Sequence, residues 1–298
     1  MRKSTKIRLI IYRILSDVYK KNSNFDNLFD HTINENILND LEKSFIFNVC
    51  QNTMRYSIHS KKILKKFAKE KLKINQYILL ASAITQIVFL NIKPYAVVNE
   101  TVEVSKIIKL NPSFINALLK NISYKIKDLK KTRIYKNDFP LWFQKEISNY
   151  KEMNLDNFLD SYFYESSLHV VFKTDKNLQE YNDEFESSSS KSAFVKTKKK
   201  VVELKEYKKG NWWVQNFSSM LPVMLIPDIK NRDILDLCAA PGGKSFQILS
   251  QNKSIVLNDI SKKRIKILKE NLERLKYSAE ITNYNALEFP ENKKFDII

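Results

Sequence analysis

Apolar residues recur at helical spacing through the first 135 residues. This segment contains no glycine, and its two prolines, Pro94 and Pro112, stand where the first turn of a helix tolerates proline. Further apolar runs predict helices over about 40–57, 59–70, 74–90, 94–108 and 112–124. The first apolar stripe consists of Ile7, Ile10, Ile11, Ile14, Leu15 and Val18. We therefore expect an all-α bundle over residues 1–135.

The pattern changes after a basic run at 127–136. A short helical stretch opens at Phe139, and β-branched alternation predicts strands at 166–174, 194–197 and 201–204. The serine-rich stretch 187–192 buries little apolar surface, so we expect a flexible loop there. Residues 136–210 are thus interpreted as a linker with a small mixed α/β subdomain.

From Arg232 onward, apolar strands alternate with helical segments. Strands are expected at 234–238, 254–258, 280–282 and 295–298, and helices at 244–251 and 261–276. Apolar runs without alternation indicate strands that are covered on both faces. Residues 211–298 therefore predict the first part of a parallel, doubly wound sheet.

Composition narrows the class of protein. With 43% hydrophobic residues among 298, the chain can bury packed cores. Cys50 and Cys238 lie far apart and outside any Cys/His cluster, which argues against a disulfide scaffold and a metal site. The longest apolar stretch, 77–89, is too short to span a bilayer, and no export signal is evident. We expect a cytoplasmic protein without a membrane partner.

The formal charge of +18 is concentrated at the N-terminus. Residues 1–150 hold 27 Lys and Arg against 12 Asp and Glu, whereas the rest hold 24 against 21. Such a field favours polyanionic partners such as nucleic acid. Only 8 of the 51 basic residues are Arg, so a Lys-rich compositional bias is the alternative. The cluster Lys61, Lys62, Lys65 and Lys66 fits either an RNA contact or a solvated helix face.

The three glycines of the chain are distributed unevenly. Gly242 and Gly243 are adjacent at the first strand-to-helix turn of the last segment, and the third is Gly210. Small residues, a proline and two residues that can adopt positive φ would let a ligand approach the backbone there. This turn lies at the carboxyl edge of the predicted sheet, where such folds bind ligands.

Asp259 ends the second predicted strand, about 20 residues after the turn. An acid there can accept hydrogen bonds from ribose hydroxyls, although it could also cap the helix that follows. A phosphate-binding Walker loop is disfavoured because Cys238 stands at its first glycine position, and a G-x-G-x-x-G motif is absent. A nucleoside linked to methionine remains as the ligand class.

The turn carries a family resemblance. Residues 236–245, Asp-Leu-Cys-Ala-Ala-Pro-Gly-Gly-Lys-Ser, resemble the S-adenosylmethionine-binding motif of RNA cytosine-5 methyltransferases of the RsmB/Sun type. Residues 210–215 look like the stretch that leads into the catalytic domain of that family. Residues 45–55, 96–104 and 114–120 are similar to segments of the NusB-like RNA-binding domain that precedes it.

The resemblance implies a fold and a site. The fold would be an N-terminal NusB-like bundle, a small mixed β subdomain and an incomplete Rossmann-like methyltransferase sheet. S-adenosylmethionine would bind the turn, with Asp259 on the ribose and Asn285 near the adenine, where the family usually has Asp. The substrate would be ribosomal RNA, of the small subunit by the habit of the family. The implied cofactor loop comprises Cys238, Ala239, Ala240, Pro241, Gly242, Gly243 and Lys244.

Enzymes of this type attack cytosine C6 with a cysteine thiolate, which makes C5 nucleophilic. The resemblance implies that this cysteine follows the strand that begins at Phe295, beyond Ile298, so residues 1–298 alone are expected to be inactive. Cys50 lies among apolar residues and Cys238 belongs to the turn, and neither suits the nucleophilic role. The alternative is a non-catalytic RNA-binding or antitermination-type module. A nucleoside triphosphatase is a distant third hypothesis.

Overall fold

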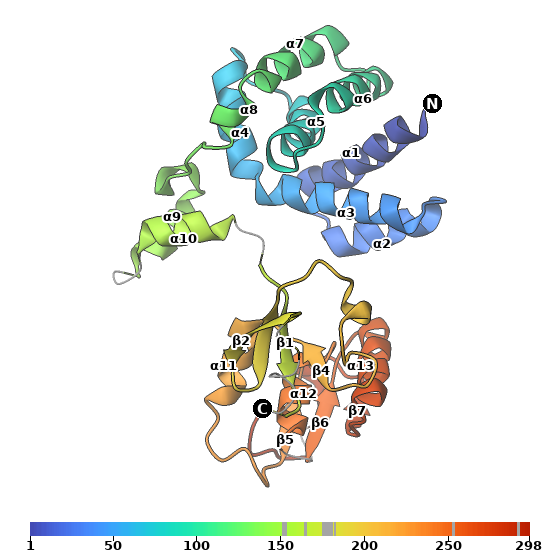
Figure 1. Cartoon of the computed structure of the whole chain (residues 1–298), viewed down its shortest axis with the longest axis vertical. Helices are drawn as coiled ribbons and strands as arrows, with labels where there is room; N and C mark the ends of the chain where they lie inside the picture. Colours follow the sequence, from blue (N-terminus) through green and yellow to red (C-terminus); the bar gives the residue numbers. More distant parts are fainter. Residues whose placement is uncertain (151–153, 164–165, 175–180, 182, 252–253, 291–292) are drawn as a thin grey trace. The chain divides into compact units, whose positions relative to one another are not determined.

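The computed structural model describes the chain except for residues 151–153, 164–165, 175–180, 182, 252–253 and 291–292 (Figure 1). Contacts divide it into two compact units, 1–164 and 165–298. The division expected from the sequence, into 1–135, 136–210 and 211–298, remains a prediction. Among the described residues, no helix is long and apolar enough to cross a membrane.

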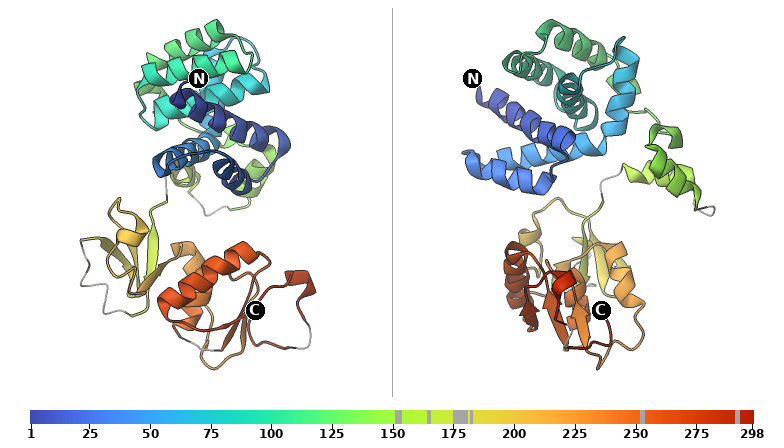
Figure 2. Two further views of the ribbon diagram at one scale, coloured as in Figure 1. Left: turned by 90° about the vertical axis from the view of Figure 1, so that its right-hand side faces the viewer. Right: turned by 180° about the vertical axis from the view of Figure 1, so that it is seen from behind.

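The first unit is a helical bundle, as predicted (Figure 2). Ile11 and Leu15 of its first helix are buried, and Pro94 and Pro112 begin two of the helices. The elements are α1 (Lys3–Lys21), α2 (Phe25–Glu35), α3 (Asp40–Arg55), α4 (Ser57–Phe67), α5 (Ile74–Ile84), the π-helical turn η1 (Thr85–Phe89), α6 (Pro94–Ile107), α7 (Pro112–Ser123), α8 (Ile126–Leu129), the 3₁₀ turn η2 (Lys136–Asp138), α9 (Leu141–Ser148) and α10 (Leu155–Tyr162). The last two belong to this unit because their apolar residues pack together with Ile58 of α4.

Two features of the bundle differ from the sequence expectation. Helix α2 escaped prediction because it has no fully buried residue; Phe25 and Phe29 are half-buried against Phe47 of α3. The predicted helix 74–90 changes its hydrogen bonding at its end, where the Leu90 amide donates to the Thr85 carbonyl five residues back.

The second unit contains two sheets. Strands β1 (His169–Phe172), β2 (Phe185–Ser189), β3 (Ser192–Val195) and β4 (Trp212–Val214) form an antiparallel sheet in the order β2-β3-β1-β4. Strands β5 (Ile234–Asp236), β6 (Ile255–Asn258) and β7 (Glu280–Thr282) form a parallel sheet in the order β5-β6-β7. The helices are α11 (Phe217–Met224), α12 (Gly243–Leu249) and α13 (Lys262–Leu275), and the 3₁₀ turns are η5 (Val201–Glu203) and η6 (Ala286–Glu288). The predicted parallel sheet is confirmed.

One apolar core joins the two sheets. Val171 of β1 and Trp213 of β4 are buried in the same cluster as Ile234 of β5 and Leu257 of β6. The Trp213 ring meets the ring of Phe246 on α12 edge to face, with centroids 6.0 Å apart. The antiparallel strands therefore support the helix that begins at the glycine turn.

Three sequence expectations for this unit were wrong or incomplete. The stretch 201–204 is a 3₁₀ turn and not a strand. The serine-rich stretch is not a loop, because Ser188 and Ser192 bond each other through their hydroxyls at 2.8 Å across the β2–β3 hairpin. The segment 295–298 pairs with β5 through a bridge between Ile234 and Ile297 and not as a full strand.

Candidate cofactor site

The turn between β5 and α12 holds the two adjacent glycines in different conformations. Gly242 has a φ of +116°, and a Cβ built there would lie 2.0 Å from Cζ of the Phe246 ring. Gly243 begins α12 in ordinary helical backbone, and a Cβ there would contact the Gln215 side chain, with Cγ nearest at 3.4 Å. Of the two glycines that are free to adopt positive φ, only Gly242 does so.

Asp259 lies just after β6 and holds this turn. Its buried carboxylate accepts hydrogen bonds from the amide of Ala240 at 3.1 Å and from the amide of Ser261 at 2.9 Å. Arg264 donates to the Ala240 carbonyl at 2.6 Å. The peptide groups on both sides of Ala240 are thus fixed by the residues that follow β6. Ser261, rather than Asp259, caps α13.

Asn258 is a site residue that the sequence analysis missed. Its buried amide nitrogen donates to the carbonyls of Leu237 and Tyr284, at 3.0 and 3.1 Å. Its oxygen accepts from the Tyr284 amide at 2.9 Å and from the Thr282 hydroxyl at 3.0 Å. One side chain therefore ties together the carboxyl ends of all three parallel strands. The only signal in the sequence is an amide residue after the apolar run Ile255–Leu257.

The remaining predicted residues lie on the same edge of the sheet. Cys238, Pro241 and Lys244 are exposed, whereas Ala239 and Ala240 are buried. Asn285 follows Tyr284, and its side-chain oxygen accepts from the Leu287 amide at 3.2 Å, so it caps η6. That residues 238–244, Asp259 and Asn285 bind a cofactor remains a prediction.

Asp236 is the last residue of β5, just before the turn. Burial raises the pKa of its carboxyl group, while a hydrogen bond from the Ser245 hydroxyl at 2.6 Å opposes that shift. Because Ser245 belongs to the first turn of α12, this contact fixes the start of the helix to the end of the strand.

The cysteines differ in environment. Cys50 of α3 is fully buried, and burial raises the pKa of its thiol well above the usual range, so it has no thiolate to offer. Cys238 is exposed in the turn. Within the described part of the chain, no group of three or more His, Cys, Asp or Glu side chains could hold a metal ion.

The residues present fit a nucleoside cofactor. One oxygen of the Asp259 carboxylate accepts a hydrogen bond from the Ala240 amide and the other from the Ser261 amide. Each oxygen can accept a further hydrogen bond, for example from a ribose hydroxyl. Gly243 presents no side chain at the start of α12, beside exposed Cys238 and Lys244.

Comparisons with known proteins agree with both parts of the chain. A model of the NusB family matches residues 5–124, and a model described as 16S rRNA methyltransferase RsmB/F matches residues 222–298. The chain thus resembles the RsmB/F methyltransferases in its last part and the NusB family in its first part. The resemblance expected from the turn and the helical segments is confirmed.

The relatives of this chain cover it to different extents. A probable ribosomal RNA small subunit methyltransferase B of Bacillus subtilis (strain 168) is 25% identical over 99% of this chain and 73% of its own. A 28S rRNA (cytosine-C(5))-methyltransferase of Mus musculus is 40% identical over 90 residues, and the chain spans only 11% of that protein. The crystal structure of PH0851 matches 98% of this chain and 72% of its own with a TM-score of 0.60 and 15% identity, which supports the fold.

Proposed function

We propose that the chain takes part in S-adenosylmethionine-dependent methylation of cytosine C5 in ribosomal RNA, of the small subunit. The observation that carries this proposal is the turn at Gly242 and Gly243, fixed by Asp259 and Arg264 at the carboxyl edge of a parallel sheet. The match of residues 222–298 to the RsmB/F model and the names of the relatives support the reaction and the substrate. Ribosomal RNA as partner and the cytoplasm as location belong to the same proposal.

Each residue has a role in this proposal. Asp259 would accept hydrogen bonds from the ribose, and Gly243 would let the cofactor approach the backbone at the start of α12. Asn285 would lie near the adenine, where a neutral amide keeps an acceptor and lacks the charge of an aspartate. Cofactor binding tests these assigned roles directly.

Titration calorimetry with S-adenosylmethionine tests the site. We expect Gly243→Asp to weaken binding at least tenfold, because it adds bulk and a negative charge at the first residue of α12, where the cofactor is proposed to bind. A first-turn acid is favourable for a helix, so the fold should persist, which circular dichroism would check. Gln251→Asp adds the same charge beyond the other end of α12 and should bind like the wild type. Equal affinity of Gly243→Asp and the wild type would rule out the assigned site.

A further inference from the structure

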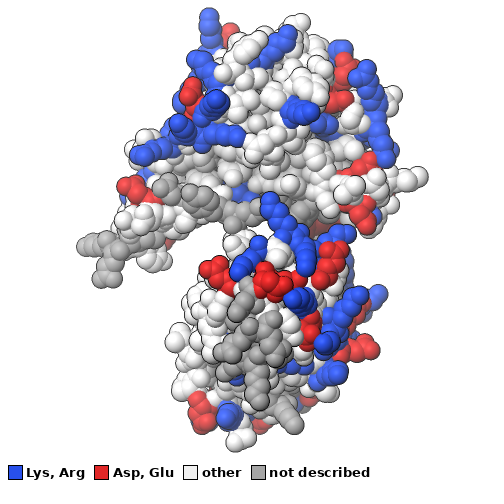
Figure 3. Space-filling model, in the orientation of Figure 1, with Lys and Arg blue, Asp and Glu red and all other residues white. Residues whose placement is uncertain are grey.

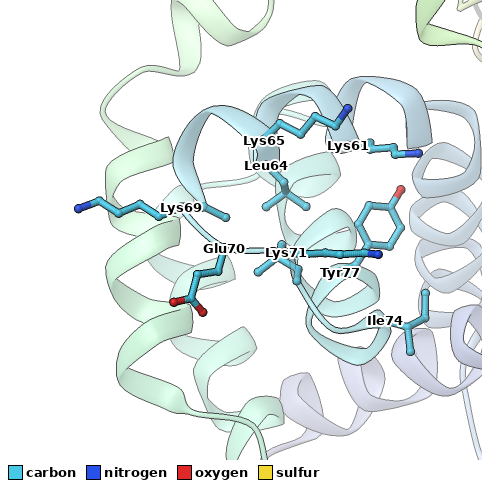
Figure 4. A pocket seen from close by; sticks show the side chains of 10 residues that line it. Lys61, Leu64, Lys65, Lys69, Glu70, Lys71, Ile74 and Tyr77 are labelled. Atoms are coloured by element: carbon cyan, nitrogen blue, oxygen red, sulfur yellow. The ribbon is translucent and has the colours of Figure 1, made fainter.

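A hollow lies between the end of α4 and the start of α5 in the first unit. It has a volume of about 780 Å³ and is bordered by the connection 68–72 (Figure 4). Figure 4 shows Lys61 and Lys65 of α4 on one side of it, and Ile74 and Tyr77 of α5 on another. The site lies outside the cofactor turn, which belongs to the second unit.

The rim of this hollow is basic. Four lysines border it against a single acid, Glu70. Among the described residues, Lys61, Lys69 and Lys71 have no ion-pair or hydrogen-bond partner. Burial opposes ionisation of the Asp138 carboxyl, but the hydrogen bond from Lys62 and, to a smaller extent, the charge of Lys65 lower its pKa. Figure 3 shows Lys and Arg side chains along the flank of this unit that α4 and α8 occupy. The rim therefore carries positive charge that the fold leaves largely uncompensated.

The floor is apolar. Its lining includes Leu64 of α4, Ala68 and Leu72 of the connection, and Ile74 of α5, which is 47% exposed. The Tyr77 ring closes one side, and its hydroxyl donates to the Ser57 carbonyl at 3.2 Å. An apolar floor beneath a lysine rim fits a ligand that combines a flat apolar group with negative charge.

A second hollow of about 500 Å³ continues the first. The two share Lys61, Lys65 and Tyr77, and the second reaches residues 137–140. At its border, the Lys62 ammonium pairs with the Asp138 carboxylate at 2.6 Å and lies 4.5 Å from the centre of the Tyr135 ring, which is 58% exposed. Lysines thus alternate with apolar or aromatic surface along both hollows, which we call the α4 groove.

We propose that the α4 groove binds single-stranded RNA, with phosphates on its lysines and an unstacked base over the Leu64–Ala68 floor. The inference rests on the proposed function, because it identifies where the RNA substrate is held outside the catalytic site. A repeating polymer of charged phosphates and flat bases matches two successive hollows with a shared lysine rim. A duplex keeps its bases stacked inside and cannot fill the floor.

Fluorescence anisotropy with a fluorescein-labelled 12-nucleotide uridine-rich RNA tests the rim. We expect Lys61→Gln/Lys65→Gln to bind about tenfold more weakly, with the salt slope reduced by about 1.4 for two lost phosphate contacts. Arg13→Gln/Lys20→Gln removes two exposed charges from α1 and should change affinity less than twofold. Equal losses for the two double variants would show a non-specific charge effect and overturn the proposal.

A third variant tests the floor separately. Ala68→Phe fills the hollow without changing charge, so we expect weaker binding of the single strand with an unchanged salt slope. Binding of a duplex of the same length should be insensitive to this substitution. Single-strand affinity equal to the wild type in Ala68→Phe would overturn the assignment of a base to the floor.

Competition identifies the class of ligand. Unlabelled RNA should displace the probe, whereas poly-glutamate and phosphatidylglycerol vesicles at equal charge should not; displacement by either would reassign the groove to an acidic protein or a lipid surface. Calorimetry with S-adenosylmethionine on the groove variants separates the two proposals. Normal cofactor binding together with unimpaired RNA binding would reject the groove and leave the cofactor site standing.

Discussion

At the scale of single residues, the two adjacent glycines show what a sequence can and cannot reveal. The scarcity of glycine elsewhere in the chain marked the turn correctly, but the sequence left open which of the two glycines adopts positive φ. The structure separates them, because Gly242 has a φ of +116° against the Phe246 ring and Gly243 is helical. Which of two neighbours takes the left-handed conformation depends on a ring four residues later, and spacing alone does not show that.

This difference predicts that the same substitution destabilises the protein much more at Gly242 than at Gly243. Gly242→Ala should lower the free energy of unfolding by about 3 kcal/mol, because a methyl group there combines backbone strain with overlap on Phe246. Gly243→Ala should change it by less than about 1 kcal/mol, since its Cβ makes ordinary contact with Gln215. Thermal unfolding by circular dichroism measures both, and similar losses would contradict the assignment.

At the scale of elements, the local sequence pattern predicted strands correctly where apolar residues are regularly buried. It failed where side chains distant in the sequence stabilise the strand. Strands β5, β6 and β7 were predicted from their apolar runs, and all three form. The serine-rich stretch was assigned to a loop, yet Ser188 lies in β2, where its hydroxyl meets Nε2 of His169 on β1 at 2.8 Å. Polar strands of this kind are stabilised by cross-strand bonds that no local pattern reveals.

The edge of the parallel sheet gives a prediction about Asn258. Asn258→Ala would leave two carbonyls, one amide and one hydroxyl without their partner, so the free energy of unfolding should fall by about 3 kcal/mol. Asn283→Ala is the matched control, because this exposed asparagine also donates twice, to the carbonyls of Asp259 and Ile260. It should cost no more than about 1 kcal/mol. Urea unfolding followed by tryptophan fluorescence compares the two, and equal losses would show that Asn258 does not hold the edge.

At the scale of the whole molecule, the sequence predicted the resemblance to RsmB/F and NusB proteins, the helical bundle and the parallel sheet. The turn motif and the helical segments were specific enough because each occupies several consecutive residues in an expected element. The side-chain contacts inside the bundle could not be predicted from the sequence, as His59 of α4 shows. Its ring is buried among the rings of Tyr56, Phe89 and Phe163, which come from separate parts of the first unit. Burial and the nearby Lys62 charge lower the pKa of His59 to about 4, while Asp138 opposes this shift.

This shift makes the stability of the first unit depend on pH. Below about pH 6.5, the unfolded chain binds a proton on this ring that the folded chain does not bind until about pH 4, so stability falls as the pH falls through this window. Because the ring is buried, we expect a loss of about 3 kcal/mol from pH 7 to pH 4. His59→Gln should remove that part of the acid sensitivity, whereas His31→Gln, which replaces an exposed histidine of α2, should retain it. Hydrogen exchange of the α3–α4 amides at pH 7 and pH 4.5 reports this unit alone. If the wild type and His59→Gln lose protection equally on acidification, carboxylate titration and not His59 governs the acid stability of the bundle.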